Sequence, residues 1–256
     1  MERSILDRAP DKLSGAPETV LVAGAGGGIG NAFCEALVQV FPAIGIVRLA
    51  RRPAALEPLR APTTDLACDI SDEESIGQAI DSLPKGMPID WVFVATGWLH
   101  DEERSPEKTY RSLDPANLAY AYQINAIGPA ILVKHLIPHL SRSRPARIGI
   151  LSARVGSISD NRLGGWHAYR ASKAALNMLI KNYAIELVRQ KPGHVIVGLQ
   201  PGTTDTGLSA PFQRNVPKDQ LQTPEFTATR LLGVMRRLRQ EDSGGLFDFE
   251  GMPFAP

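Results

Sequence analysis

Short apolar runs alternate with amphipathic stretches along most of this chain. Runs rich in Val, Ile and Leu are typical of strands that are buried on both faces of a sheet. Such runs predict strands at residues 19–23, 44–50, a segment ending at 67–70, 89–95, 146–151 and 194–200. Apolar residues at helical spacing lie between them, as in residues 31–40. The alternation predicts an α/β fold with a single doubly wound parallel sheet of Rossmann type and helices on both faces.

The chain shows one domain with a short extension. No internal repeat, low-complexity tract or linker interrupts residues 19–256. Residues 1–18 lack the apolar segment of a signal peptide and are predicted to form a flexible N-terminal extension. Residues 98–114 and 207–223 are long for connections, and such loops often cover binding sites. Residues 98–100, 160–166 and 207–223 are expected to form the substrate side.

Composition restricts the class of partner. The 256 residues carry a formal net charge of +1, which gives no electrostatic reason to expect a nucleic acid or a membrane surface as partner. No stretch reaches the roughly 18–20 uninterrupted apolar residues of a membrane span. Neither Cys34 and Cys68 nor the five histidines have metal-ligand spacing. We therefore expect a cytoplasmic protein without a bound metal.

A glycine-rich turn joins the first predicted strand to the first predicted helix. It reads GAGGGIG over residues 24–30, with Gly24, Gly28 and Gly30 at informative spacing. Glycines at this junction let the backbone approach a pyrophosphate, whose charge is stabilised by the amino end of the helix. Such turns also occur for packing alone, so the flanking strand and helix are what make this one a candidate dinucleotide site.

The residue type about 20 positions further on distinguishes the two nicotinamide cofactors. An acidic residue there binds the ribose hydroxyls of NAD(H), whereas a guanidinium suits the 2′-phosphate of NADP(H). This chain has Ala50 followed by Arg51 and Arg52. The sequence therefore favours NADP(H) over NAD(H), unless the two arginines are only solvated loop residues.

Tyr169 and Lys173 form the clearest candidate for chemistry. Their four-residue spacing, at the start of a helix predicted to continue to about Arg189, places both on one face. A phenol with an ordinary pKa near 10 is a poor acid or base at pH 7, and a neighbouring ammonium would lower that pKa. The pair alone is common on helix surfaces. Here it follows the strand at residues 146–151, near the sheet edge where ligands bind.

Asn125 is a further candidate because Pro129 follows four residues later. If residues 125–140 are helical, Pro129 cannot donate to the Asn125 carbonyl, and the helix should bend there. The freed carbonyl could hold a water molecule; alternatively, the bend has only structural value.

Four separate motifs point to one family. The glycine turn resembles T-G-x-x-x-G-x-G with Ala23 in place of Thr, and residues 169–173 match Y-x-x-x-K. Asp69 with Ile70 is similar to an adenine-contacting pair, and PGTTDT at residues 201–206 is similar to P-G-x-x-x-T. From about Thr19 to the C-terminus the chain thus resembles the short-chain dehydrogenase/reductase family. Residues 98–100 and 152–158 resemble its C-factor-like or sniffer-like carbonyl reductase branch.

This resemblance implies an NADP(H)-dependent oxidoreductase, a carbonyl reductase or alcohol dehydrogenase, acting on a small carbonyl or alcohol substrate. Tyr169 is then the proton donor or acceptor, and Lys173 orients the ribose and tunes the phenol. Ser152 binds the substrate oxygen, and Asn125 maintains a water-mediated proton relay. The implied cofactor-binding residues are Gly24, Gly28, Ile29, Gly30, Arg51, Asp69, Ile70, Gly97, Tyr169, Lys173, Pro201, Gly202, Thr204 and Thr206.

The helix that carries Tyr169 also bears on assembly. Residues 171–188 have little purely polar face, which is typical of a helix buried on several sides. Members of the family form dimers and tetramers through helices at this position. The resemblance therefore implies a homodimer or homotetramer.

Two departures from the family pattern affect the site. In the family's S-S-x-x-G motif, the catalytic serine usually lies three residues before the glycine. Here the glycine is Gly156, and the residue three positions before it is Ala153, with Ser152 one position earlier. Because successive side chains of a strand point to opposite faces, Ser152 can serve only if a bulge re-aims it; otherwise it is a structural hydroxyl. The family's N-N-A-G is VATG at residues 94–97, so the hydrogen bonds of its asparagines must come from elsewhere, such as Thr96.

Two other functions fit parts of this pattern. The resemblance to C-factor-like proteins admits an NADP(H)-binding regulatory or signalling protein with little turnover, and the serine register favours it. The intact Tyr169 and Lys173 argue for an enzyme, because binding alone does not need a tuned phenol. A sugar-nucleotide epimerase would keep both residues but normally needs a larger substrate domain.

Overall fold

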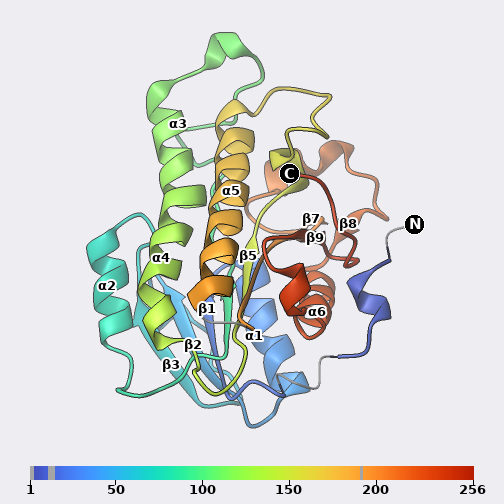
Figure 1. Ribbon diagram of the computed structural model, residues 1–256. Helices are drawn as coiled ribbons and strands as arrows, with labels where there is room; N and C mark the ends of the chain where they lie inside the picture. Colours follow the sequence, from blue (N-terminus) through green and yellow to red (C-terminus); the bar gives the residue numbers. More distant parts are fainter. Residues whose placement is uncertain (1–2, 11–14, 191–192) are drawn as a thin grey trace.

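A seven-stranded parallel sheet forms the centre of the computed structural model, which describes residues 3–10, 15–190 and 193–256 (Figure 1). Its strand order is β3-β2-β1-β4-β5-β6-β9. The strands are β1 (Thr19–Ala23), β2 (Gly45–Ala50), β3 (Thr63–Ala67), β4 (Trp91–Val94), β5 (Arg147–Leu151), β6 (Val195–Gln200) and β9 (Leu246–Asp248). A separate pair consists of β7 (Thr203–Thr204) and β8 (Leu221–Gln222). The chain order reverses between β1 and β4, the point at which open α/β sheets bind ligands.

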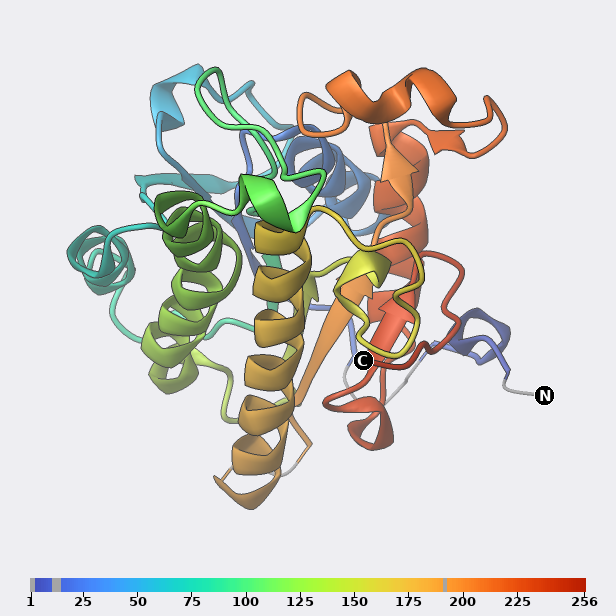
Figure 2. The same ribbon diagram turned by 90° about the horizontal axis from the view of Figure 1, so that it is seen from above.

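Helices cover both faces of this sheet (Figure 2). They are α1 (Gly28–Val40), α2 (Glu73–Asp81), α3 (Pro115–Tyr122), α4 (Gly128–Leu136), α5 (His167–Gln190) and α6 (Pro224–Met235). α1 and α6 pack on one face, where Phe33 and Phe93 stack with ring centres 3.8 Å apart. α2, α4 and α5 pack on the other, around Ile150 and Leu176. Burial on both faces explains why the strands read as continuous apolar runs. The predicted doubly wound Rossmann-type fold is confirmed.

The predicted strands differ from the observed ones mainly at their ends. The strand predicted at residues 89–95 is shorter, and the third strand ends at Ala67 rather than at Ile70. The sequence does not predict β9, because three residues after two glycines are too short to form a recognisable pattern. β9 nevertheless pairs with β6 and completes the edge of the sheet.

Part of the predicted N-terminal extension is packed against the domain. A 3-10 helix, Ile5–Asp7, lies beside α6, and Ile5 is buried (Figure 1). The Ile5 N–H donates to the Gly251 carbonyl, and Arg8 forms an ion pair with Asp242. For residues 3–10 these contacts correct the expectation of a flexible segment, because Ile5 and Leu6 pack against the core on the α6 face. Residues 1–2 and 11–14 of the predicted extension lie outside the described residues.

The helical region around Asn125 is irregular. α3 leads into one π-helical turn, Gln123–Ile127, and α4 is followed by a 3-10 turn, Ile137–His139. The single helix predicted for residues 125–140 is therefore divided. The π-helical turn ends two residues before Pro129, as expected where a proline removes a backbone donor.

The Asp72 carboxylate caps the start of α2, where it accepts the N–H of Glu74. The Ser71 hydroxyl donates to Asp69, at the edge of the candidate site. Within the part of the chain that the structure describes, no helix has the length and apolar character to cross a membrane.

Candidate active site

A cleft lies beyond the carboxyl ends of β1 and β4. It consists of two cavities of about 450 and 590 Å³, which share the backbone at Gly26, Gly27 and residues 95–97. Arg51 lines the smaller cavity, and Tyr169 lines the larger one. The predicted cofactor and catalytic residues all line this cleft, except Gly30 and Asn125, which lie behind its surface.

The glycine turn forms the wall of the cleft between β1 and α1. Gly24 has a φ of +79°, and a Cβ there would lie 3.0 Å from the Ala95 carbonyl carbon. A Cβ at Gly30 would lie 2.2 Å from the Gly24 carbonyl oxygen, so only glycine lets α1 pack on the turn. Gly27 caps α1 without a side-chain acceptor, which leaves the first N–H groups available to an anion. The turn therefore fits a pyrophosphate.

The smaller cavity has basic side chains at the end of β2. Arg51 and Arg52 line it and are exposed, and Ala50 stands where an acidic residue would be required for an unphosphorylated ribose. Asp69 also lines it. Hydrogen bonds from the Ser71 hydroxyl and N–H, at 2.7 and 2.9 Å, lower the pKa of Asp69, and the Arg51 charge adds to this. These residues fit a 2′-phosphorylated adenosine.

Tyr169 and Lys173 extend from the first two turns of α5 into the larger cavity. Lys173 is 2% exposed, and its Nζ donates to the Leu151 carbonyl at 2.9 Å. This Nζ lies 5.8 Å from the centre of the Tyr169 ring. Burial lowers the pKa of Lys173 to about 8 and raises the pKa of Tyr169 to about 12. The direction for Tyr169 is opposite to the one predicted, because burial disfavours the charged phenolate.

Asn125 is fully buried and joins three segments. Its Oδ1 accepts the Trp98 N–H at 2.7 Å, and its Nδ2 donates to the Trp98 carbonyl at 2.8 Å and to the Ser172 hydroxyl at 3.0 Å. Gly97 lies beside it, since a Cβ there would be 3.8 Å from Asn125 Oδ1 and 3.9 Å from Lys173 Nζ. Asn125 thus fixes the chain after β4 against α5, and its role in a proton relay stays a prediction.

Ser152 borders the larger cavity, but its hydroxyl is directed into the interior. The ladder between β5 and β6 continues without a bulge, and the Ser152 N–H donates to the Leu199 carbonyl at 2.8 Å. The side chain therefore follows Ile150 to the α5 face, where its hydroxyl donates to Asn177 Oδ1 at 2.6 Å. Ala153 is next on extended backbone and lines the larger cavity. The condition under which Ser152 could bind the substrate oxygen is not met in this geometry.

Residues 201–206 close the cleft beside the glycine turn. Thr206 lies against this turn, since a Cβ at Gly28 would be 2.8 Å from Thr206 Cγ2. Thr204 is 4% exposed, and its hydroxyl lies 2.9 Å from the Thr227 hydroxyl on α6. The Thr204 side chain therefore holds the segment to α6, whereas Thr206 borders the cleft.

A chain of ring contacts leads from Tyr169 through Trp166 and Phe212 to His100. The Trp166 ring centre lies 6.3 Å from that of Tyr169 and 5.0 Å from that of Phe212, and the His100 ring lies 5.5 Å from Phe212. All three loop segments predicted for the substrate side contribute to this lining. Trp98, by contrast, lines the smaller cavity.

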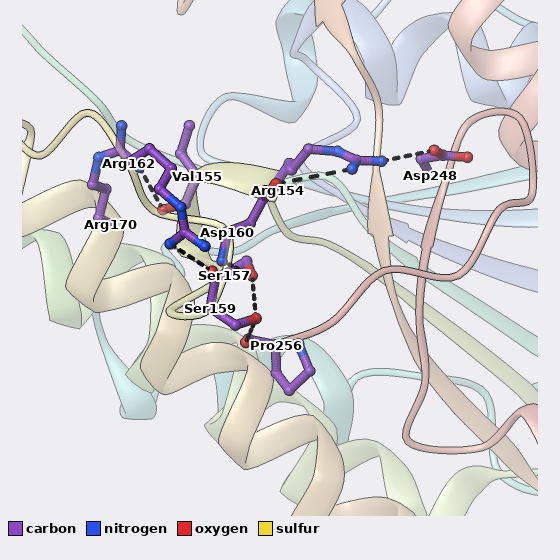
Figure 3. A network of polar contacts seen from close by, with 9 residues as sticks. All are labelled: Arg154, Val155, Ser157, Ser159, Asp160, Arg162, Arg170, Asp248 and Pro256. Carbon is purple, nitrogen blue, oxygen red and sulfur yellow. Dashed lines mark hydrogen bonds and ion pairs between the residues drawn. The ribbon is translucent and has the colours of Figure 1, made fainter.

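Arg154 also lines the larger cavity, but its charge is neutralised. Its guanidinium pairs with Asp248, at the end of β9, at 3.0 Å and with Asp160, in the loop between β5 and α5, at 3.9 Å (Figure 3). In the same network the Pro256 carbonyl accepts from the Ser159 hydroxyl. The cavity beside Tyr169 is therefore mainly apolar. Over residues 3–10, 15–190 and 193–256, no group of three His, Cys, Asp or Glu side chains could hold a metal ion.

Known proteins share this sequence and architecture. A family model described as short chain dehydrogenase matches residues 18–217. A 1-hydroxy-2-glutathionyl-2-methyl-3-butene dehydrogenase from Rhodococcus sp. (strain AD45) is 32% identical over 185 residues, which are 71% of this chain and 75% of the relative. C-signal from Myxococcus xanthus is 34% identical over 139 residues, 54% of this chain and 78% of the relative. The crystal structure of an NADPH-bound carbonyl reductase from chicken fatty liver superposes with a TM-score of 0.79 at 25% identity, covering 93% of this chain and 99% of that one.

The family model spans both the glycine turn and the start of α5, which both line the cleft. The first of these relatives exceeds 30% identity over more than two thirds of the chain. Sequence, sheet order and cleft agree, and the chain belongs to the short chain dehydrogenase family.

Proposed function

We propose that this protein is an NADP(H)-dependent oxidoreductase that reduces a carbonyl compound to an alcohol, or catalyses the reverse oxidation. The observation that carries this proposal is the position of Tyr169 and Lys173 in a cavity continuous with the glycine-lined cleft. NADPH, held by the residues of the cleft, would supply a hydride to the carbonyl carbon. Tyr169 would give a proton to the carbonyl oxygen, and its pKa of about 12 keeps the phenol protonated near neutral pH.

The other residues of the cavity prepare this proton transfer. Lys173 is expected to hydrogen-bond the ribose and to return a proton to Tyr169 after each reduction. Trp166 and Phe212 line the same cavity, and with substrate bound they are expected to keep water away from the phenol. Because Arg154 is already paired with Asp248, the cavity suits a neutral substrate with apolar groups next to its carbonyl.

The preference for NADP(H) rests on Arg51. The parent protein is expected to bind NADPH more tightly than NADH, and Arg51→Ala is expected to weaken NADPH binding about tenfold or more, since a charge-assisted hydrogen bond contributes about 1.5–3 kcal/mol. NADH binding should change little. Isothermal calorimetry on both cofactors measures this, with Arg60→Ala as a control because Arg60 is exposed on the same connection and outside the cavity lining. Equal affinity of the parent for both cofactors would contradict the proposal.

A regulatory NADP(H)-binding protein with little turnover is the second candidate. Two observations favour it: the Ser152 hydroxyl already donates its hydrogen bond to Asn177 Oδ1, and the chain is similar to C-signal. Ala153 leaves the cavity without a serine at the place where the family pattern has one. Pure binding would not need the buried Lys173, whose desolvation is costly, so we place the oxidoreductase first.

Substitutions at residues 152 and 153 distinguish the two candidate positions for a hydroxyl that binds the substrate oxygen. Ala153→Ser should add a hydrogen-bond donor near the substrate oxygen and raise kcat about tenfold, whereas Ser152→Ala should change kcat by less than about threefold. Steady-state NADPH oxidation at 340 nm measures both, and NADPH affinity should stay unchanged. A loss of about 10²-fold in Ser152→Ala would instead assign the oxygen-binding role to Ser152.

We also propose a homodimer or homotetramer in the cytoplasm. Met178 and Ile185 are exposed apolar residues seven positions apart on α5, so assembly through this helix would remove them from water. Cys34 and Cys68 are free and buried, which fits a reducing compartment.

A further inference from the structure

The amino end of α5 is held by a buried carboxylate from a distant segment. The first N–H groups of a helix have no partner within it, and Tyr169 lies in this first turn. Glu107, in the loop of residues 98–114, accepts the Ala168 N–H on its Oε2 at 3.1 Å. Figure 2 shows this loop, in green, crossing the amino end of α5, in gold. A capping residue normally precedes its helix directly, whereas Glu107 stands 61 residues before Ala168.

The backbone of Glu107 fixes the residue before the helix as well. Its carbonyl oxygen accepts the Trp166 N–H at 2.5 Å. Trp166 has a φ of +48°, in the left-handed region that a bulky residue adopts only where its surroundings impose it. Gly165 precedes it with a φ of +66°, and a Cβ there would lie 3.6 Å from the Glu107 carbonyl oxygen. This close approach determines where the Trp166 indole lies relative to Tyr169.

The Glu107 carboxylate occupies a buried position that is unfavourable for a charged group. The residue is 3% exposed, and its Oε1 has no hydrogen-bond partner among the described residues. Burial of a carboxylate is unfavourable unless its charge is stabilised, and the amino end of α5 supplies a positive partial charge. The carboxylate and the helix end therefore stabilise each other, which ties the loop to the first turn of α5.

We propose that Glu107 is a positioning residue for the proton donor. Its carboxylate and its carbonyl together set the first turn of α5 and the conformation of Trp166. They thereby fix the direction of the Tyr169 hydroxyl and the width of the apolar cavity. The inference rests on the proposed role of Tyr169, because only a reacting phenol requires such exact placement.

Three variants test this inference. Glu107→Ala should lower kcat about tenfold or more, leave the dissociation constant of NADPH unchanged and speed amide hydrogen exchange at Ala168 and Tyr169. Glu107→Gln keeps an acceptor oxygen and should stay within about threefold of the parent in kcat. Glu103→Ala, in the same loop with an 82% exposed side chain, should match the parent in every measurement.

Other results for these variants would overturn the inference or the proposed function. Parent-like kcat in Glu107→Ala, or unchanged exchange at Ala168, would overturn the inference. Equal impairment of Glu107→Gln and Glu107→Ala would show that the acceptor oxygen does not matter, which also overturns it. If Glu107→Ala does not fold, Glu107→Asp keeps the charge on a shorter side chain and should still lose kcat. If the parent reduces no carbonyl, the proposed function fails, and exchange in Glu107→Gln and Glu107→Asp still decides the capping role.

Discussion

Tyr169→Phe is expected to lower kcat by about 10²-fold or more on any carbonyl compound that the parent reduces, with little change in NADPH affinity. The substitution removes one hydroxyl, while the ring can still pack against Trp166. The glycine turn and Arg51 are untouched, so chemistry and binding should separate. NADPH oxidation measures the first and calorimetry the second.

Tyr183→Phe provides the matched control on the same helix. The Tyr183 hydroxyl donates to the Ala130 carbonyl at 2.8 Å, and the residue is outside the lining of either cavity of the cleft. Its loss should leave kcat unchanged and lower stability slightly. Near-normal turnover in Tyr169→Phe would show that another group donates the proton.

Lys173→Met is expected to abolish most turnover while making the protein more stable at pH 7. Burial lowers the pKa of Lys173 from its ordinary 10.5 to about 8, so the folded protein carries a charge that it would hold more easily when unfolded. That displacement corresponds to about 3 kcal/mol, at about 1.4 kcal/mol per pH unit. Methionine is similar in length and carries no charge. The free energy of unfolding should rise by about 1–3 kcal/mol, because loss of the hydrogen bond to the Leu151 carbonyl offsets part of the stabilisation obtained by removing the buried charge.

The dependence of stability on pH provides a second test of the buried Lys173 ammonium. Between about pH 8 and 10.5 the unfolded chain holds the Lys173 proton and the folded chain does not. The contribution of Lys173 to the free energy of unfolding should therefore increase with pH over this range. Tyr169 acts in the opposite direction above its ordinary pKa of 10.0, because its folded pKa is raised to about 12. The buried thiols of Cys34 and Cys68, with pKa values raised from 9.0 to about 12 and about 11, act in this opposite direction from about pH 9 upward. The difference between the parent and Lys173→Met in denaturant titrations from pH 7 to 10 therefore isolates the lysine.

Lys181→Met is the control for this experiment, since Lys181 is exposed on the same helix. It should leave both kcat and the slope of stability with pH unchanged. If Lys173→Met were no more stable than the parent at pH 7 and kept the same slope, the buried ammonium would not be the cause.

The parts of the site that the sequence predicts are those whose chemistry is local. Gly24 and Gly30 are required by a turn of seven residues, and the spacing of Tyr169 and Lys173 fixes a shared helix face. Strand parity leaves two orientations open for Ser152, and the bulge-free β5 directs its hydroxyl to Asn177 instead of the substrate-oxygen position that the resemblance implies.

The parts that the sequence misses depend on contacts between distant segments. Glu107 looks like one of several charged loop residues until its carboxylate is seen at the start of α5. Asn177 likewise becomes relevant only through the Ser152 hydroxyl. The pKa of Tyr169 depends on how completely the surrounding loops remove water, which helical spacing does not reveal.

Hydride transfer itself is the most direct test of the central claim. The parent protein is incubated with NADPH deuterated at C4 of the nicotinamide, separately in each configuration, and with aromatic and aliphatic aldehydes and ketones; the products are analysed by mass spectrometry. The proposed function predicts alcohol carrying one deuterium on the former carbonyl carbon from one of the two cofactors, and its near disappearance in Tyr169→Phe. Tight NADPH binding by calorimetry, without deuterated alcohol from any carbonyl compound tested, would contradict it and favour the regulatory protein.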